Sequence, residues 1–119
     1  CVAKGITIGS HGMSHRNLAK IADGRVLQEE VEGSKRKIKK ELGVDANIFS
    51  FPNGLHNARS VGVVRDCGYR FALLCEERTV AHMDIKKEDI FHILPRLGMR
   101  NSTWQEENLR FLGLHRGLF

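Results

Sequence analysis

Short apolar segments alternate along the chain with longer segments whose apolar residues recur at helical spacing. The segments that we expect to form strands are residues 6–8, 47–51, 70–75 and 90–97. The segments that we expect to form helices are residues 26–42, 58–67 and 103–114. Strands that alternate with helices in this way are typical of an α/β domain built on a mainly parallel sheet.

Local signals mark where several of these elements begin and end. Gly43 and Asn57 have the places of a helix C-cap and a helix N-cap. The tripeptide Pro52-Asn53-Gly54 ends the second expected strand with a strong turn signal. Functional residues of parallel sheets gather in the loops that follow the strands. We therefore expect them in residues 10–16 and 52–57.

Composition and charge narrow the range of partners. The 119 residues are enough for one domain, and their formal net charge of +5 makes nucleic acid a partner to consider. Much of the excess lies in residues 35–40, in an expected helix that also carries several glutamates. No aromatic residue is interleaved with these lysines. We interpret this segment as a solvated helix face and expect no nucleic-acid partner.

Two other classes of protein are disfavoured. No apolar run is long enough to span a bilayer. The three cysteines show no CxxC spacing, so they indicate neither a disulfide framework nor a zinc knuckle.

The clearest candidate for chemistry is a pair of histidines, His11 and His15, in the loop after the first expected strand. Residues four apart share one face if the loop enters a helical turn, so both imidazoles could bind one ion. Neutral imidazole is a common zinc ligand, and a catalytic site usually adds a third ligand and a water position. Because the chain has six histidines, spacing alone leaves open that both are ordinary polar loop residues.

The sequence around this pair resembles the second motif of the NodB-homology polysaccharide deacetylases, a carbohydrate esterase family. Residues 6–18 read ITIGSHGMSHRNL: a strand, two small residues, two histidines four apart and a trailing Asn-Leu. Gly12 stands where the family usually has a hydroxyl residue. The resemblance implies that His11 and His15 bind a catalytic divalent metal, which we expect to be zinc.

Residues 49–54, FSFPNG, are similar to the third motif of the same family, an aromatic-rich strand that ends in Pro-Tyr-Gly or Pro-Asn-Gly. The resemblance implies that Pro52 and Gly54 contact the substrate. It also implies that the backbone N–H of Asn53 donates to the oxyanion, a role that a rigid turn suits. The alternative for this motif by itself is a plain β-turn.

Many members of the family carry an arginine in the third motif that orients the catalytic aspartate, where this chain has Ser50. Residues 93–99 are similar to a late strand of the family that bears a Pro-Arg pair. Arg96 is therefore our candidate for that role. The alternative is a surface arginine on an edge strand.

The chain also departs from the family pattern. The first motif, an Asp-Asp pair that supplies the general base and the third metal ligand, is absent from the sequence. We expect it upstream of Cys1, which makes residues 1–119 a single partial domain without its first strand. The family's Leu-x-His motif supplies a general acid, but Gly113 occupies the place of its leucine. We do not expect His115 to be that acid.

The resemblance implies a partial distorted (β/α) barrel that hydrolyses N- or O-acetyl groups on a polysaccharide or oligosaccharide with the help of a metal. One alternative is a deacetylase-like domain that binds carbohydrate without catalysis. Another is a nucleic-acid-binding module that uses residues 35–40. Analogy with the family suggests the cell envelope or the exterior as the location.

Overall fold

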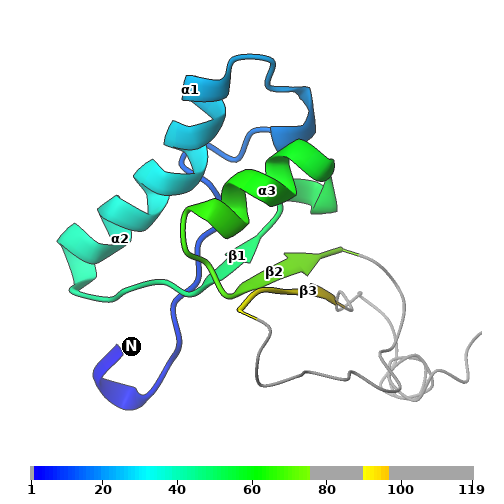
Figure 1. Ribbon diagram of the computed structural model, residues 1–119. Helices are drawn as coiled ribbons and strands as arrows, with labels where there is room; N and C mark the ends of the chain where they lie inside the picture. The colour runs from blue at the N-terminus through cyan, green and yellow to red at the C-terminus, as the bar shows by residue number, and fades with distance from the viewer. Residues whose placement is uncertain (1, 76–89, 97–119) are drawn as a thin grey trace, which may run out of the picture.

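The computed structural model describes residues 2–75 and 90–96 (Figure 1). The elements in chain order are η1 (Val2–Lys4), η2 (Leu18–Lys20), α1 (Gly24–Gln28), η3 (Glu29–Gly33), α2 (Ser34–Leu42), β1 (Ile48–Ser50), η4 (Pro52–Gly54), α3 (Ala58–Asp66), β2 (Phe71–Leu74) and β3 (His92–Pro95). The helix expected at residues 103–114 and His115 both lie outside the described residues.

The three strands form one parallel sheet in the order β1-β2-β3. Phe49 pairs with Ala72, which in turn pairs with Ile93. Helix α3 connects β1 to β2, as expected because parallel neighbours need a crossover connection. The predicted α/β class with a parallel sheet is therefore confirmed.

The helices α1, α2 and α3 lie together on one side of this sheet (Figure 1). Successive strand residues point to opposite faces, and Phe49, Ala72 and Leu74 are buried beneath the helices. Each fully buried large apolar side chain stabilises the fold by about 1.5–3 kcal/mol. The helix side chains in this core include Leu27, Val31, Val64 and, partly buried, Ile38. The alternate residues Ser50 and Leu73 face the other way and are half-buried.

The long helical segment is interrupted by a π-helical turn. It begins at Gly24, two residues before the expected start, because the Asp23 side chain accepts hydrogen bonds from the N–H groups of Arg25 and Val26. The π turn η3 separates α1 from α2. The helix ends as predicted, with Gly43 in the left-handed conformation at φ 68°.

The predicted strand at residues 6–8 is wrong. Residues 6–8 form no strand, and the pairing of this part of the described chain with the sheet is one isolated bridge, between Ser10 and Phe49. The Ser10 N–H donates to the Ile48 carbonyl at 2.8 Å, and the Ser50 N–H donates to the Ser10 carbonyl at 2.8 Å. Because β1 is only three residues long, it provides no further partners for the exposed residues before Ser10.

The remaining boundaries follow the sequence signals. Asn57 caps α3 in a reciprocal capping box with Ser60, as the sequence predicted in part. Lys35 of α2 contacts the residues just before β2, since its Nζ donates to the Gly68 carbonyl at 2.9 Å and lies 4.7 Å from the Tyr69 ring centroid.

Within residues 2–75 and 90–96, no helix has the length and apolar character needed to cross a membrane.

Candidate functional site

The two candidate histidines lie beside each other. Their ring centroids are 4.8 Å apart, with the ring planes inclined at 67°. The loop does not enter a helical turn, because Gly12 and His15 both have positive φ, 82° and 59°. The imidazoles lie together in a loop whose conformation contains these two positive φ angles. A positive φ is uncommon for a residue with a side chain and persists only where its surroundings hold it.

One histidine is oriented by the end of β1. His11 Nδ1 lies 2.7 Å from the Ser50 carbonyl oxygen. A carbonyl can only accept, so Nδ1 must donate, and the Nε2 lone pair of the neutral ring stays available. Metal-binding histidines usually donate their second ring nitrogen to a carbonyl or carboxylate in this way. His11 thus has the orientation that a metal ligand needs.

The backbone between the two histidines is held by Glu30 from the π turn. The Glu30 carboxylate accepts the N–H groups of Met13 at 3.1 Å and Ser14 at 3.0 Å, and also the Ser14 hydroxyl. Sequence reasoning missed Glu30, because it was grouped with the solvated charges of its helix. A signal was present, since Glu30 lies three residues after Leu27 and beside Val31, on the apolar face of the helix.

A second set of hydrogen bonds fixes the residue before His11. Ser10 Oγ accepts the Gly12 N–H at 3.3 Å and lies 2.6 Å from Ser34 Oγ. Ser34 donates to the Val31 carbonyl at 2.7 Å, and the Tyr69 hydroxyl donates to the same carbonyl at 3.1 Å. Burial raises the pKa of Tyr69, so its hydroxyl remains a donor at neutral pH. This buried network joins the histidine loop to the helix and to the start of β2.

The Pro52-Asn53-Gly54 turn lies against the histidine loop. Pro52 is fully buried, and a Cβ placed on Gly12 would be 3.8 Å from its ring. Asn53 is exposed with φ 53°, and its N–H donates to no acceptor within the described part of the chain. Gly54 is packed against Cys75 at the end of β2. Roles for these three residues in substrate binding or oxyanion stabilisation stay predictions.

A hollow of about 360 Å³ opens on the face of the sheet away from the helices, and His11, Ser50 and Arg96 are among the residues that line it. The structure therefore brings Arg96, which directly follows β3, to the same hollow as His11, although they are far apart in sequence. The Ser50 hydroxyl is buried and has no hydrogen-bond partner among the described residues. Its orphaned oxygen is a place where a bound polar group could gain a hydrogen bond.

The two histidines are not joined by further metal-binding side chains in the described residues. Over residues 2–75 and 90–96, no group of three or more His, Cys, Asp or Glu side chains comes together as a metal site. The described residues therefore supply two ligands at most. The zinc ligand set of three that we expect needs a contribution from elsewhere.

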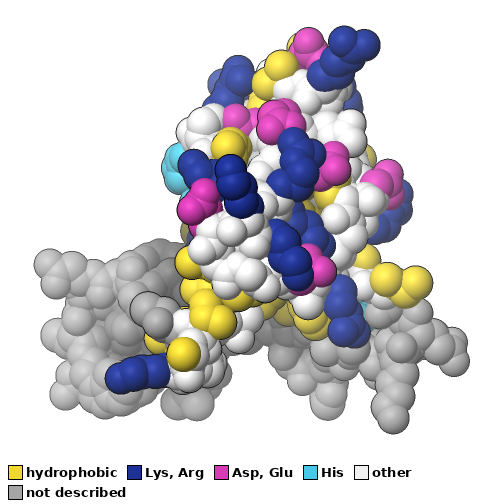
Figure 2. Space-filling model, turned by 90° about the vertical axis from the view of Figure 1, so that its left-hand side faces the viewer, with side chains coloured by type: hydrophobic (Ala, Val, Ile, Leu, Met, Phe, Trp, Pro, Cys, Tyr) yellow, Lys and Arg dark blue, Asp and Glu magenta, His cyan; other side chains and the backbone are white. Residues whose placement is uncertain are grey.

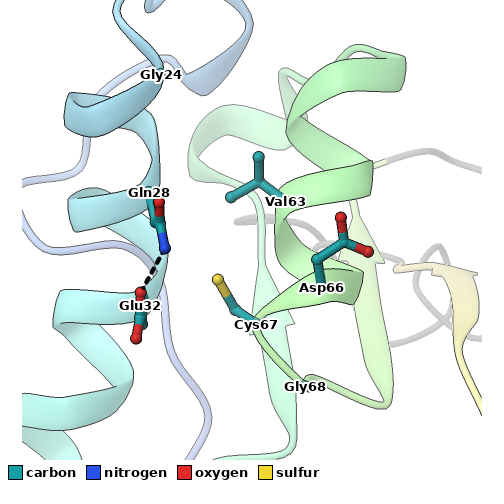
Figure 3. Close-up of a pocket in the computed structure, with 7 residues that line it drawn as sticks. All are labelled: Gly24, Gln28, Glu32, Val63, Asp66, Cys67 and Gly68. Atoms are coloured by element: carbon teal, nitrogen blue, oxygen red, sulfur yellow. Dashed lines mark hydrogen bonds between the residues drawn. The ribbon is translucent and has the colours of Figure 1, made fainter.

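A larger hollow of about 560 Å³ lies between the long helical segment and α3, apart from the histidines (Figure 3). Gln28 and Glu32 line one wall, and the Cys67 thiol points toward them from the other. Burial raises the pKa of this thiol, and the neighbouring Glu32 charge raises it further. A protonated thiol is a poor nucleophile and a poor metal ligand.

The basic segment of α2 has acidic neighbours. Arg36 pairs with Glu29 and Glu32 at 2.6 and 3.3 Å, and Lys35 lies 3.6 Å from Asp45. Figure 2 shows Lys and Arg side chains interspersed with Asp and Glu side chains on the face that it presents. This mixture of charges is what a solvated helix face has.

Comparisons with known proteins give one consistent answer. The model of the polysaccharide deacetylase family matches residues 1–72. A polysaccharide deacetylase from Bacillus cereus, BC0361, is similar in structure with a TM-score of 0.75 and 22% identity, over 92% of this chain and 34% of that one. IcaB from Ammonifex degensii has a TM-score of 0.72 and 15% identity, over 96% and 49%.

The deacetylase PplD from Streptococcus pyogenes, solved with acetate, has a TM-score of 0.70 and 18% identity, over 87% of this chain and 43% of that one. This chain thus spans from about a third to about half of these solved structures. No curated protein matches it significantly. The fold is the partial α/β fold of the NodB-homology type that the sequence predicted. On the family match over residues 1–72, the chain belongs to the polysaccharide deacetylase family.

Proposed function

We propose that this chain is part of an enzyme that hydrolyses N- or O-acetyl groups on a polysaccharide or oligosaccharide with the help of a divalent metal. The observation that carries the proposal is the pairing of His11 and His15, whose rings are 4.8 Å apart, together with the His11–Ser50 hydrogen bond that leaves Nε2 available. Family membership supports the substrate class.

His11 and His15 would hold the metal, which we expect to be zinc. When bound, zinc polarises an acetyl carbonyl and lowers the pKa of a coordinated water. The third ligand and the general base would come from an aspartate pair outside this chain, as the family pattern implies. Two histidines without a third ligand would bind zinc weakly, so the 119-residue chain by itself should have little activity.

The chain's other candidate residues would act around this pair. The N–H of Asn53, which has no acceptor among the described residues, would donate to the oxyanion that develops on the acetyl carbonyl, since a fixed donor stabilises charge most when it needs no reorientation. Arg96 lines the same hollow as His11 and would orient the carboxylate base. Pro52 and Gly54 would form the wall of the substrate site by fixing the turn that carries Asn53.

The test is acetate release from an acetylated chito-oligosaccharide by the protein expressed from its natural start to its natural stop, with zinc. His15→Ala should lower the rate at least about 100-fold, because losing a ligand should exceed the roughly 10–100-fold effect of losing a ligand's supporting partner. His92→Ala is the matched control. His92 stacks on Phe71 at the opposite end of the sheet, so this variant should keep most of the activity.

Two results would contradict the proposal. One is a His15→Ala variant as active as the parent protein. The other is a folded, zinc-loaded parent that releases no acetate from N- or O-acetylated oligosaccharides. Retained binding of the oligosaccharide in that second case would favour the alternative, a deacetylase-like domain that only binds carbohydrate.

A further inference from the structure

We infer that Glu30 is the positioning residue of this site: it holds the loop in the shape that brings His11 and His15 together. Glu30 belongs to the π turn η3, not to either loop of the site. Its effect on metal binding rests on the proposed function. Its effect on the loop rests on contacts alone.

The contacts of Glu30 are made to the backbone between the two histidines. Its carboxylate accepts the N–H groups of Met13 and Ser14 and the Ser14 hydroxyl. A Cβ placed on Gly12 would lie 3.5 Å from the same carboxylate. The carboxylate thus contacts Met13 and Ser14 directly and leaves little room beside Gly12. Hydrogen bonds to an ionised acceptor are about twice as strong as neutral ones.

The burial of Glu30 indicates a specific role. The residue is only 7% exposed, and none of the described Lys, Arg or His side chains forms a salt bridge with it. A buried carboxylate without a cation is unfavourable unless donors satisfy its oxygens. The donors here are those of the histidine loop. The carboxylate and the loop therefore depend on each other.

The π turn gives a second, independent indication. Such turns are rare and are often found at functional sites. In this turn the Val31 carbonyl accepts the hydroxyls of Ser34 and Tyr69, and Ser34 is within 2.6 Å of Ser10 Oγ. Glu30 and Ser34 therefore reach the loop on either side of His11, one through residues 13 and 14 and the other through residue 10.

The consequence concerns the backbone of His15. His15 has a φ of 59°, and such a positive φ persists only where neighbouring contacts hold it. Glu30 supplies such contacts at Ser14, the residue directly before His15. Without the carboxylate, Met13 and Ser14 lose the acceptor for their N–H groups. His15 is then free to adopt a negative φ, which would turn its ring away from His11. Two imidazole ligands that no longer face each other bind one metal ion less tightly.

The experiment compares four proteins, each expressed from its natural start to its natural stop: the parent, Glu30→Ala, Glu30→Gln and Glu32→Ala. Zinc affinity is measured by competition with a chromophoric chelator, and amide exchange is measured at Met13 and Ser14. Glu30→Ala should lose roughly 10–100-fold in zinc affinity, the usual effect of removing a ligand's support, and both amides should exchange faster. Glu30→Gln keeps one acceptor oxygen and should recover most of the loss.

The control removes the same charge from the same turn. Glu32 contacts Gln28 and Arg36 and does not touch the loop, so Glu32→Ala should leave zinc affinity within about twofold of the parent. A Glu30→Ala variant within about twofold of the parent, or one with unchanged exchange at both amides, would overturn the inference. If Glu30→Ala does not fold, Ser14→Ala removes one donor alone, and an unchanged zinc affinity in that variant would overturn it equally.

Failure of the proposed function gives a different pattern. A parent that binds zinc and loses affinity in Glu30→Ala, yet releases no acetate, refutes the deacetylase activity and supports the positioning role. A parent that binds no zinc refutes the metal-dependent activity. The amide exchange of Met13 and Ser14 in Glu30→Ala then tests the positioning of the loop by itself, and unchanged exchange at both amides overturns it.

Discussion

The turn that carries Asn53 requires glycine at position 54, and any other residue there should lower the free energy of unfolding. Gly54 has φ 69°, and a Cβ at this position would lie 2.6 Å from Cys75 Cβ and 2.8 Å from the Cys75 backbone nitrogen. Contacts under 3 Å with backbone atoms cannot be relieved by rotating a side chain. Gly54→Ala must therefore displace either the Pro52–Gly54 turn or the end of β2.

Two separate costs make up the expected loss. Placing a residue with a Cβ in the left-handed region costs roughly 1–2 kcal/mol. Forcing an extra methyl group into a packed site costs typically about 1–3 kcal/mol. The free energy of unfolding should therefore fall by about 2–5 kcal/mol, which is a large part of the total stability of a typical domain.

Urea unfolding measures this loss, and Gly43→Ala separates its two parts. Gly43 has nearly the same φ, 68°, but nothing lies within 4 Å of a Cβ built there. Its substitution should carry the conformational cost alone, about 1–2 kcal/mol. With a urea m-value near ~2 kcal/mol/M, a loss of about 3 kcal/mol in Gly54→Ala lowers the midpoint by about 1.5 M. Equal midpoints for the two variants would refute the argument from close contact.

Three further predictions concern the side chains of Tyr69 and Cys67. Tyr69→Phe removes the hydroxyl that donates to the Val31 carbonyl. The free energy of unfolding, measured in urea, should fall by about 0.5–1.5 kcal/mol, because Ser34 still donates to that carbonyl. A loss above about 3 kcal/mol would contradict this argument. Burial raises the pKa of Cys67, so the protonated thiol favours the folded state. This stabilisation is complete below the pKa that Cys67 has in the unfolded chain, and it is lost as the pH rises through the pKa of Cys67 in the folded chain. Cys67 should also be alkylated by iodoacetamide more slowly than the exposed Cys75, as peptide mass mapping would show, and equal rates would refute the argument.

Much of the fold was predictable from short-range signals. Gly43 ends a helix and Asn57 begins one, as expected, because capping depends on residues within a turn of each other. The apolar segments at 47–51 and 70–75 became β1 and β2, since a short apolar run next to a turn has few alternatives. The pairing of His11 and His15 as candidates also came from local spacing together with the family resemblance.

The points at which local signals misled or did not decide share a cause. The segment at residues 6–8 has the composition of a strand, but strand formation also needs a partner of sufficient length, and β1 is too short. Spacing alone left open whether the histidine loop enters a helical turn, and its hydrogen bonds go to Glu30 in another element. In both cases, contacts between distant parts of the chain decided the outcome.

The sequence by itself therefore determined the class of fold, the helix caps and the identity of the candidate ligands. Only the tertiary structure decided how those ligands are held: His11 by the Ser50 carbonyl, the loop by Glu30, and Arg96 in the same hollow as His11. The physical reason is distance along the chain. Caps and turns are formed by neighbouring residues, whereas these contacts join residues 16 or more positions apart, and they exist only once the sheet and helices have packed.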